Sequence, residues 1–166
     1  VGVIDDHSEL RWDIRPSPKW GTIEVRAFDG IPTFHEVAAL AALTQCLVER
    51  YSRELDAGRQ IPSLQPWFVR ENKWRAARYG MDAIIICNPA GDERLVTDDL
   101  GDLLTTLDPI SEDYACNAEV GAVRDIIERG ASYQRQIHVA EENGGDLRAV
   151  VAHLVHELQE DPRPRA

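Results

Sequence analysis

The chain has 166 residues, of which 43% are hydrophobic and 28% are charged, a balance that is ordinary for a globular domain with its own core. Its formal net charge of -11 argues against a surface that binds nucleic acid or an anionic membrane, because such partners need a basic field. A local cluster of arginines, lysines or metal ions can still hold a phosphate, so nucleotide binding stays open.

The cysteines indicate the redox compartment of the protein, and the first residue of the chain indicates that it is part of a longer protein. Cys46, Cys87 and Cys116 are widely spaced and form no C-x-x-C motif. This indicates a reducing compartment without structural disulfides, and we expect each thiol to be a small buried side chain rather than a nucleophile. No apolar run is long enough to span a bilayer, so we expect a cytoplasmic protein. Because the chain starts at Val1 and its only methionine is Met81, we expect a part of a longer protein.

The first predicted strands lie near the N-terminus. Residues 12–15 form a short candidate strand, which the proline-rich turn at residues 16–18 ends. Residues 22–29 form the clearer strand, with a turn over residues 29–32, because polar and apolar side chains alternate along it. The two faces carry Ile23, Val25 and Ala27 on the apolar side, and Thr22, Glu24, Arg26 and Phe28 on the other.

A long helix is predicted next, from a capping box of Thr33 and Glu36 to about residue 56, where Gly58 stops it. Its apolar positions at helical spacing are Val37, Leu40, Ala41, Leu43, Leu47, Val48, Tyr51 and Leu55. A loop over residues 61–66 leads to a second helix near residues 67–79, which Gly80 closes.

The second half of the chain predicts a hairpin and four helices. Residues 83–87 read as a buried strand, residues 88–92 as a turn and residues 94–96 as the return strand. We expect Thr97 to cap the next helix, and further helices near residues 117–129, 132–142 and 146–160. The helix that Thr97 caps has an apolar stripe of Leu100, Leu103, Leu104 and Leu107. The stripe of the helix near residues 146–160 is Leu147, Val150, Val151, Leu154, Val155 and Leu158.

These elements predict an α+β fold that is rich in helix. The proline- and arginine-rich tail at residues 161–166 is expected to be disordered. Only three or four strands are predicted, and so small a set with a polar face calls for further strands as sheet partners.

Glu24 and Arg26 are the sharpest chemical feature of the sequence. Residues two apart on a strand point to the same side, so this carboxylate and this guanidinium project together. The pair suits magnesium–nucleotide chemistry, since carboxylates ligate hard cations and arginine forks onto phosphate oxygens. An exposed strand whose charges pair across the sheet is the alternative, and the spacing alone does not decide between the two.

A basic run on the second predicted helix comprises Asn72, Lys73, Arg75 and Arg78. Glu71, Arg75 and Arg78 share one helix face. The run indicates either contact with an anion or nucleotide at the rim of a site, or a solvated face with a Glu71–Arg75 pair. Arg135 carries the same two interpretations. The chain has no Walker A, G-x-G-x-x-G or G-x-S-x-G motif, so P-loop, Rossmann and serine-hydrolase assignments lack support.

Three blocks of sequence resemble the signature of the carboxylate–amine ligase family, also called type 2 glutamate–cysteine ligases. They are WDIRPSPKWGTIEVR at positions 12–26, ENKWRAARYG at positions 71–80 and GASYQRQ at positions 130–136. Their order and spacing are similar to those of the family's C-terminal half, and they cover nearly the whole chain. The combination is specific, whereas each block alone is only suggestive.

The resemblance implies a glutamine-synthetase-like fold, in which antiparallel strands form the floor of the active site and helices pack outside. Residues 1–160 would be the C-terminal half of one ligase catalytic domain. ATP and Mg²⁺ are the implied cofactors, and glutamate and an amine such as cysteine are the implied substrates. The implied reaction activates the glutamate carboxylate as an acyl phosphate for attack by the amine.

The same resemblance implies roles for individual residues. Glu24 becomes a metal ligand, and Arg26 and Arg15 become catalytic residues, with Arg26 on phosphate and Arg15 on substrate or phosphate. The residues expected at the nucleotide are Arg26, Asn72, Arg75, Arg78 and Arg135.

The chain departs from a complete family member in its metal ligands. The family's other ligands, typically a Glu-x-Glu pair and a histidine, are not found here, and one carboxylate cannot hold several Mg²⁺ ions. We therefore expect the N-terminal half of the same protein to complete the site. The alternatives are a non-catalytic helical interaction module that keeps the ligase scaffold, or an enzyme of the same fold with other substrates. A homodimer and the identity of the acceptor amine stay open.

Overall fold

The structure, a computed structural model, describes residue 2 and residues 4–161. It divides into two compact units, Val1–Ile31 and Pro32–Ala166. Helices and two small antiparallel sheets make up these units, which confirms the predicted α+β class. Apart from Asp161, the predicted disordered tail lies outside the described residues. Among the helices that the structure describes, none is both long and apolar enough to cross a membrane.

The first unit is organised by a hairpin. The 3-10 helix η1 (His7–Glu9) precedes strands β1 (Ile14–Ser17) and β2 (Thr22–Val25), which pair in antiparallel fashion. The turn between them uses Gly21 at a φ of 63°, a conformation that glycine adopts at little cost. Two strands of this length leave both faces of the hairpin open to solvent.

Strand β2 is shorter than the sequence predicts. We expected a strand over residues 22–29, but β2 ends at Val25. The Arg26 N–H donates to Asp13 O at 2.7 Å, one residue before β1 begins. Beyond this point no residue of β1 remains to pair with, so the alternating pattern of Ala27 and Phe28 continues without becoming strand.

The second unit begins with helix α1 (Phe34–Asp56). Its predicted cap is confirmed, since Thr33 Oγ1 accepts a hydrogen bond from the Glu36 N–H at 3.2 Å. The Glu36 carboxylate, however, turns toward Arg135 instead of closing the capping box. Asp161, just after the last helix, accepts hydrogen bonds from the first two N–H groups of α1, at 2.6 and 3.1 Å. The start of α1 is therefore held by two side chains from opposite ends of the unit.

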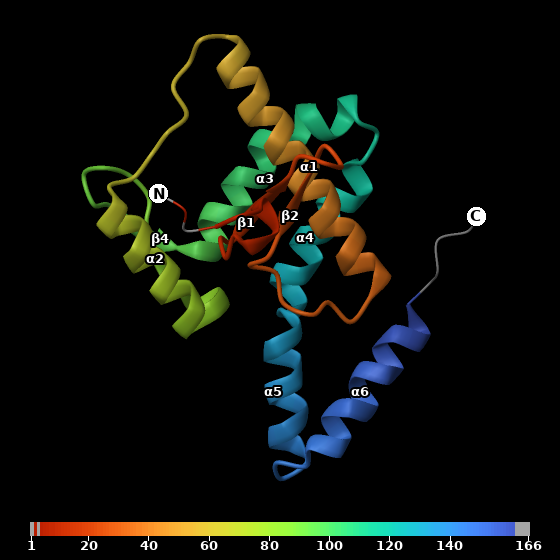
Figure 1. Ribbon diagram of the computed structural model, residues 1–166. Helices are drawn as coiled ribbons and strands as arrows, with labels where there is room; N and C mark the ends of the chain where they lie inside the picture. Colours follow the sequence, from red (N-terminus) through yellow and green to blue (C-terminus); the bar gives the residue numbers. More distant parts are fainter. Residues whose placement is uncertain (1, 3, 162–166) are drawn as a thin grey trace. The chain divides into compact units, whose positions relative to one another are not determined.

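Helices α1, α3 (Val96–Asp113) and α4 (Asn117–Arg129) pack against one another (Figure 1), and one hydrophobic core joins them. The buried residues of this core are Ala39, Ala42, Leu43, Cys46, Leu104, Leu107, Ile110, Val120, Ala122 and Val123. The leucine stripe predicted for α3 is confirmed. The buried apolar positions of α1 are Ala39, Ala42, Leu43 and Cys46, most of them small enough to let the neighbouring helices approach. Of the predicted stripe, the residues Val37, Ala41, Val48, Tyr51 and Leu55 are exposed.

A second hairpin, β3 (Ile84–Ile86) with β4 (Glu93–Leu95), packs on helix α2 (Pro66–Tyr79). The hairpin prediction is confirmed, but the prediction of a buried strand is wrong. Ile84 is 52% exposed and Cys87 is exposed as well, because a single helix covers only one face of two strands.

Helix α3 starts one residue before its predicted cap. We expected Thr97 to cap this helix, but Thr97 lies inside it, since α3 begins at Val96. The Val96 N–H donates to Ala83 O at 2.9 Å. Backbone pairing of the hairpin thus runs directly into the helix, and no side-chain cap is used.

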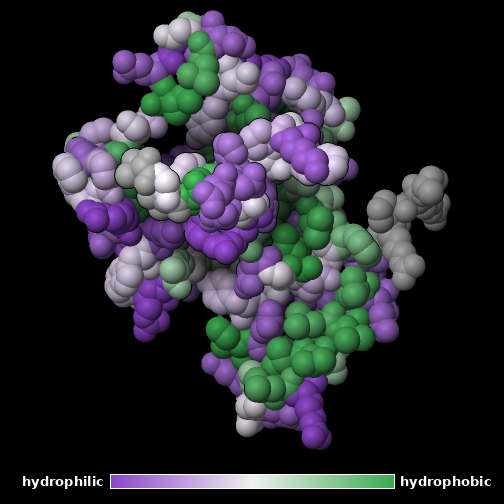
Figure 2. Space-filling view, viewed as in Figure 1, coloured by the Kyte–Doolittle hydropathy of each residue, from purple (hydrophilic) through white to green (hydrophobic). Residues whose placement is uncertain are grey.

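Helices α5 (Ser132–Glu142) and α6 (Leu147–Glu160) lie side by side as a helical hairpin (Figure 1). Their predicted bounds are confirmed, with Asp146 as the cap of α6. Of the apolar stripe of α6, only Val150 is buried. Figure 2 shows a continuous apolar surface over this helix. The exposed apolar side chains of this hairpin are Ile137, Leu147, Val151, Val155 and Leu158.

Candidate functional site

The β1–β2 hairpin brings three predicted site residues together. Arg15 and Glu24 are directly opposite each other in the register, so their side chains leave the hairpin on the same face. Arg26 follows Glu24 by two positions and joins them. Sequence spacing predicted the neighbourhood of Glu24 and Arg26. The place of Arg15 depends on the pairing register, which only the structure provides.

Glu24 lies between two guanidinium groups. Arg15 Nε donates to Glu24 Oε2 at 2.7 Å, and Arg26 Nη1 donates to Glu24 Oε1 at 3.2 Å. The Glu24 side chain is 47% exposed, so these ion pairs are partly screened by water. The charges of this cluster sum to about one positive unit, which suits an anionic ligand. Both interpretations of the sequence are therefore compatible with this face: the charges pair across the sheet, and they remain accessible.

Arg15 also anchors the hairpin to the segment before it. Its Nη1 donates to Ser8 O at 2.7 Å, in the short helix η1. Arg15 and Glu24 line a pocket of about 270 Å³ within the first unit, together with Lys19 and Trp20. The Lys19 ammonium lies 5.0 Å from the centre of the Trp20 ring, a cation–π distance. The pocket thus has basic and aromatic walls beside two carboxylates, those of Asp6 and Glu24.

The metal-binding potential of these residues is limited. Glu24 offers carboxylate oxygens of the type that Mg²⁺ prefers. Among the residues that the structure describes, no three histidine, cysteine, aspartate or glutamate side chains converge as a cation site. Glu24 therefore fits as one ligand of a hard cation, and a complete site needs ligands from elsewhere in the protein.

Asn72 of helix α2 completes the edge of strand β3. Its Nδ2 donates to Ile86 O at 2.8 Å, and its Oδ1 accepts from the Ile86 N–H at the same distance. The side-chain amide therefore pairs with the backbone as a neighbouring strand would. This role was not foreseen from the sequence, since it depends on how α2 packs against the hairpin.

Arg75 joins the same helix to both strands of the hairpin. It donates to Glu71 at 2.9 Å, to Ile84 O at 2.9 Å and to Glu93 at 2.7 Å. Hydrogen bonds to Glu71 and then Glu93 raise the pKa of Arg75 above its ordinary value. The Glu71–Arg75 pair that the sequence offered as an alternative is confirmed. Arg78 is exposed beyond it and lies 5.5 Å from the centre of the Tyr79 ring.

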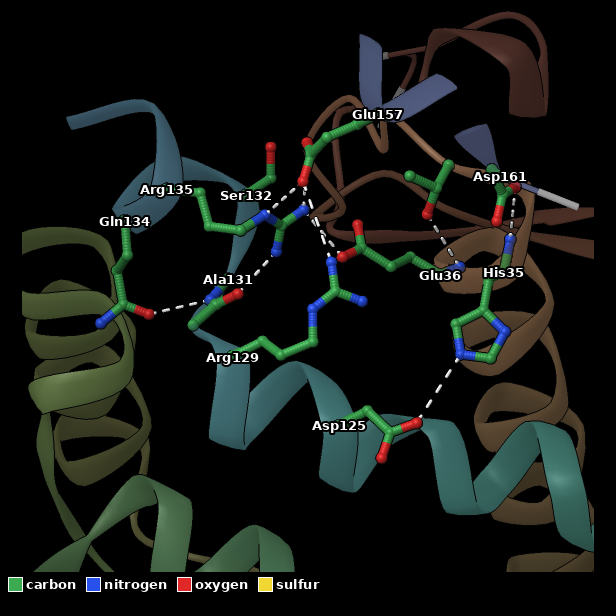
Figure 3. Close-up of polar contacts among 12 residues, drawn as sticks. His35, Glu36, Asp125, Arg129, Ala131, Ser132, Gln134, Arg135, Glu157 and Asp161 are labelled. Atoms are coloured by element: carbon green, nitrogen blue, oxygen red, sulfur yellow. Dashed lines mark hydrogen bonds and ion pairs between the residues drawn. The ribbon is translucent and has the colours of Figure 1, made fainter. Parts of the chain in front are cut away.

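Arg135 lies in a cluster of charges where α1, α5 and α6 meet, which Figure 3 shows. Its Nε donates to Glu157 Oε1 at 2.7 Å, its Nη1 donates to Gly130 O at 2.6 Å, and its Nη2 lies 2.8 Å from Glu36 Oε1. The Glu36 contact is an ion pair without an aligned hydrogen bond. Arg129 approaches Glu157 from the end of α4, at 3.9 Å.

This cluster is largely withdrawn from water. The side chains of Arg135, Glu157 and Glu36 are 12%, 10% and 5% exposed. Arg135 also lines a pocket of about 430 Å³ with Arg129 and His138. Its guanidinium therefore ties three helices together and reaches the edge of a pocket. The two glutamates are distant in sequence, and no local signal marks them as its partners.

Known proteins are similar to this chain over nearly all of its length. The sequence model of glutamate-cysteine ligase family 2 (GCS2) matches residues 1–153. A protein of Clavibacter michiganensis subsp. michiganensis, named "Putative glutamate--cysteine ligase 2", is 64% identical over 159 residues. Proteins of the same name from Leifsonia xyli subsp. xyli and Mycobacterium tuberculosis are 58% and 57% identical.

Each alignment covers nearly all of this chain but less than half of the relative. They include 96% of this chain for the first two relatives and 95% for the third, but 42% of the length of each relative. The chain thus spans less than half the length of the curated relatives it matches.

Proposed function

Because the chain belongs to glutamate–cysteine ligase family 2, we propose that the protein containing it is an ATP-dependent ligase that joins the side-chain carboxylate of glutamate to an amine such as that of cysteine. The family assignment supports the reaction class. The nucleotide, the metal and the substrates are part of the proposal, as is a reducing, cytoplasmic setting.

The observation that carries the proposal is the face of the β1–β2 hairpin. Glu24 is held between Arg15 and Arg26 on one side of two paired strands. A carboxylate in this position can ligate a cation that accompanies ATP, while a guanidinium beside it can take the phosphate oxygens.

The proposed chemistry has two steps. The glutamate carboxylate attacks the terminal phosphorus of ATP and releases ADP, and the amine then attacks the resulting acyl phosphate and releases inorganic phosphate. Mg²⁺, when bound, would offset the charge of the polyphosphate. Arg26 would bind the transferred phosphoryl group as its negative charge is redistributed. Arg15 would hold Glu24 in orientation through the ion pair and the hydrogen bond to Ser8 O.

The rest of the site is proposed to come from the remainder of the protein. We propose that the β1–β2 hairpin joins an antiparallel sheet of a glutamine-synthetase-like domain, of which this chain would be the C-terminal half. The further ligands of the cation would lie on that sheet. Arg78, exposed on α2, is the better candidate for a nucleotide contact, because Asn72, Arg75 and Arg135 already bind backbone and carboxylate groups of their own unit.

Substituting Glu24 tests the proposal in the full-length protein. We expect Glu24→Gln to lower kcat for glutamate- and cysteine-dependent phosphate release by about 100-fold or more, because the amide is a poor ligand for a hard cation. The fold should be kept, as judged by circular dichroism. Glu119→Gln, at an exposed position of α4, is the matched control and should be as active as the wild type.

Two results would count against the assignment. Full activity of Glu24→Gln would remove Glu24 from the metal site. Failure of the wild-type protein to bind Mg-ATP in a calorimetric titration would favour a module without ligase activity.

A further inference from the structure

Two of the three cysteines meet in the interior of the second unit. Cys46 lies in the middle of α1 and is fully buried, and Cys116 is the residue before α4 and is partly exposed. Their Sγ atoms are 3.7 Å apart. No local signal in the sequence pairs these cysteines, because 70 positions separate them.

The backbone around Cys116 holds this thiol against α1. The preceding residue, Ala115, has a φ of 52°, in the left-handed region that side-chain-bearing residues seldom adopt. This turn reverses the chain between α3 and α4, and the Cys116 N–H donates to Ser111 O at 2.9 Å. Val120, one turn further along α4, is buried in the core against α1. The approach of the two thiols is therefore imposed by the helix packing.

The two thiols are in non-bonded contact. A disulfide has sulfur atoms about 2.05 Å apart, so the 3.7 Å between these two must shorten by about 1.7 Å for the bond to form. Burial, and then the hydrogen bond with Cys116, raise the pKa of Cys46 to about 11. At neutral pH the buried thiol is thus protonated, and the more exposed Cys116 is the one that an oxidant can reach first.

We propose that Cys46 and Cys116 form an oxidation site, at which a low-molecular-weight disulfide converts the two thiols into a reversible cross-link between α1 and the start of α4. The Cys116 thiolate attacks the oxidant RSSR, forming a mixed disulfide and releasing one RS⁻. Cys46, on losing its proton to water, then attacks the Cys116 sulfur and releases the second RS⁻. The protein loses two hydrogens, and RSSR becomes two RSH.

The inference concerns the core of α1, α3 and α4 and does not depend on the ligase assignment. Disulfides in reducing compartments are usually transient or redox-sensing, which suits a pair that is reduced at rest and poised to close. Cys87, exposed after β3, is the internal control for oxidation. It is also a free thiol, but among the described residues its Sγ contacts neither Cys46 nor Cys116.

Peptide mapping of the full-length protein tests the proposal. The probe is oxidised glutathione at neutral pH, under native conditions, followed by alkylation and digestion with trypsin. The arginine and lysine positions place Cys46, Cys87 and Cys116 on separate peptides, residues 27–50, 79–94 and 95–124. We expect a linked pair of peptides 27–50 and 95–124 that dithiothreitol separates, and a higher melting temperature of the oxidised protein.

Variants separate the two steps. Cys116→Ser should lose the linked pair, and Cys87→Ser should keep it. Cys46→Ala should retain glutathione on Cys116, because the second thiol is missing. Ala at position 46 keeps a small apolar group in the core, and if it still unfolds the protein, Cys116→Ser and Cys87→Ser carry the test by themselves.

Three outcomes would overturn the inference. They are a link that forms only in denaturant, a link that involves Cys87 as often as Cys46, and a wild-type protein in which glutathione stays on Cys116 beside a reduced Cys46.

Discussion

Replacing Arg135 by methionine should destabilise the protein by about 3–5 kcal/mol, because it leaves two buried carboxylates without their shared cation. The structure supports this magnitude. The bond to Glu157 is charge-assisted and contributes about 1.5–3 kcal/mol, and the bond to Gly130 O contributes about 1 kcal/mol. Glu36, with a side chain 5% exposed, would lose the ion pair at 2.8 Å. Water screens these ion pairs only weakly, because the side chains of Arg135 and its two partners are largely buried.

Urea unfolding followed by circular dichroism measures this loss. The midpoint should fall while the slope m stays constant, since the surface exposed on unfolding is unchanged. Arg148→Met is the matched control, because Arg148 is exposed on α6, and it should change stability by about 0.5 kcal/mol or less. Adding Glu157→Gln to Arg135→Met should recover part of the loss, as one buried charge is removed. A loss below about 1 kcal/mol for Arg135→Met would refute the view that the cluster is a buried, interdependent unit.

Three further substitutions probe the second unit. Asn72→Ala should lower the free energy of unfolding in urea by about 2 kcal/mol, since the N–H and C=O groups of β3 lose their two 2.8 Å bonds; an unchanged midpoint would show that water replaces the amide. Ala115→Gly should raise the free energy of unfolding by about 1 kcal/mol, and with it the melting temperature, because glycine relieves the positive φ. Ala152→Gly, inside α6, is the control and should lower the free energy of unfolding by about as much. Equal losses at both sites would contradict a strained turn. A hydrogen bond from Arg53 lowers the pKa of Glu49, so its stabilising contribution is present above the ordinary glutamate pKa and is lost as the pH falls through the lowered value. Glu49→Gln should therefore make the melting temperature less dependent on pH as the pH falls through the ordinary glutamate pKa and below it, and an unaltered acid profile would argue against this contribution.

Local signals in the sequence predicted the helices well. Gly80 ends α2, Thr33 caps α1, and the bounds of α4 and α5 coincide with the predicted ones. Caps, glycines and helical spacing act within one or two turns of chain, so their effect can be read without the fold. Strand ends were predicted less well: β2 stops at Val25, because a strand lasts only as far as a partner strand accompanies it.

In the candidate site, too, some contacts could be predicted from sequence spacing and others only the fold brought about. Spacing along one strand was sufficient to place Glu24 beside Arg26, and three sequence blocks were sufficient to indicate the family. Arg15 reached Glu24 through the hairpin register, and Asn72 reached the backbone of β3 through the packing of α2. Neither contact has a local signature.

By itself, then, the sequence determined the helices, the ligase family and one pair of neighbouring charges, since each depends on residues close together in the chain. Tertiary packing decided which face of α1 became the core, where the Glu36 carboxylate turned, and that Cys46 met Cys116. The sequence offers several apolar faces that could be buried and several charged groups that could pair. Which of them do so depends on which distant segments of the chain approach one another in the folded structure.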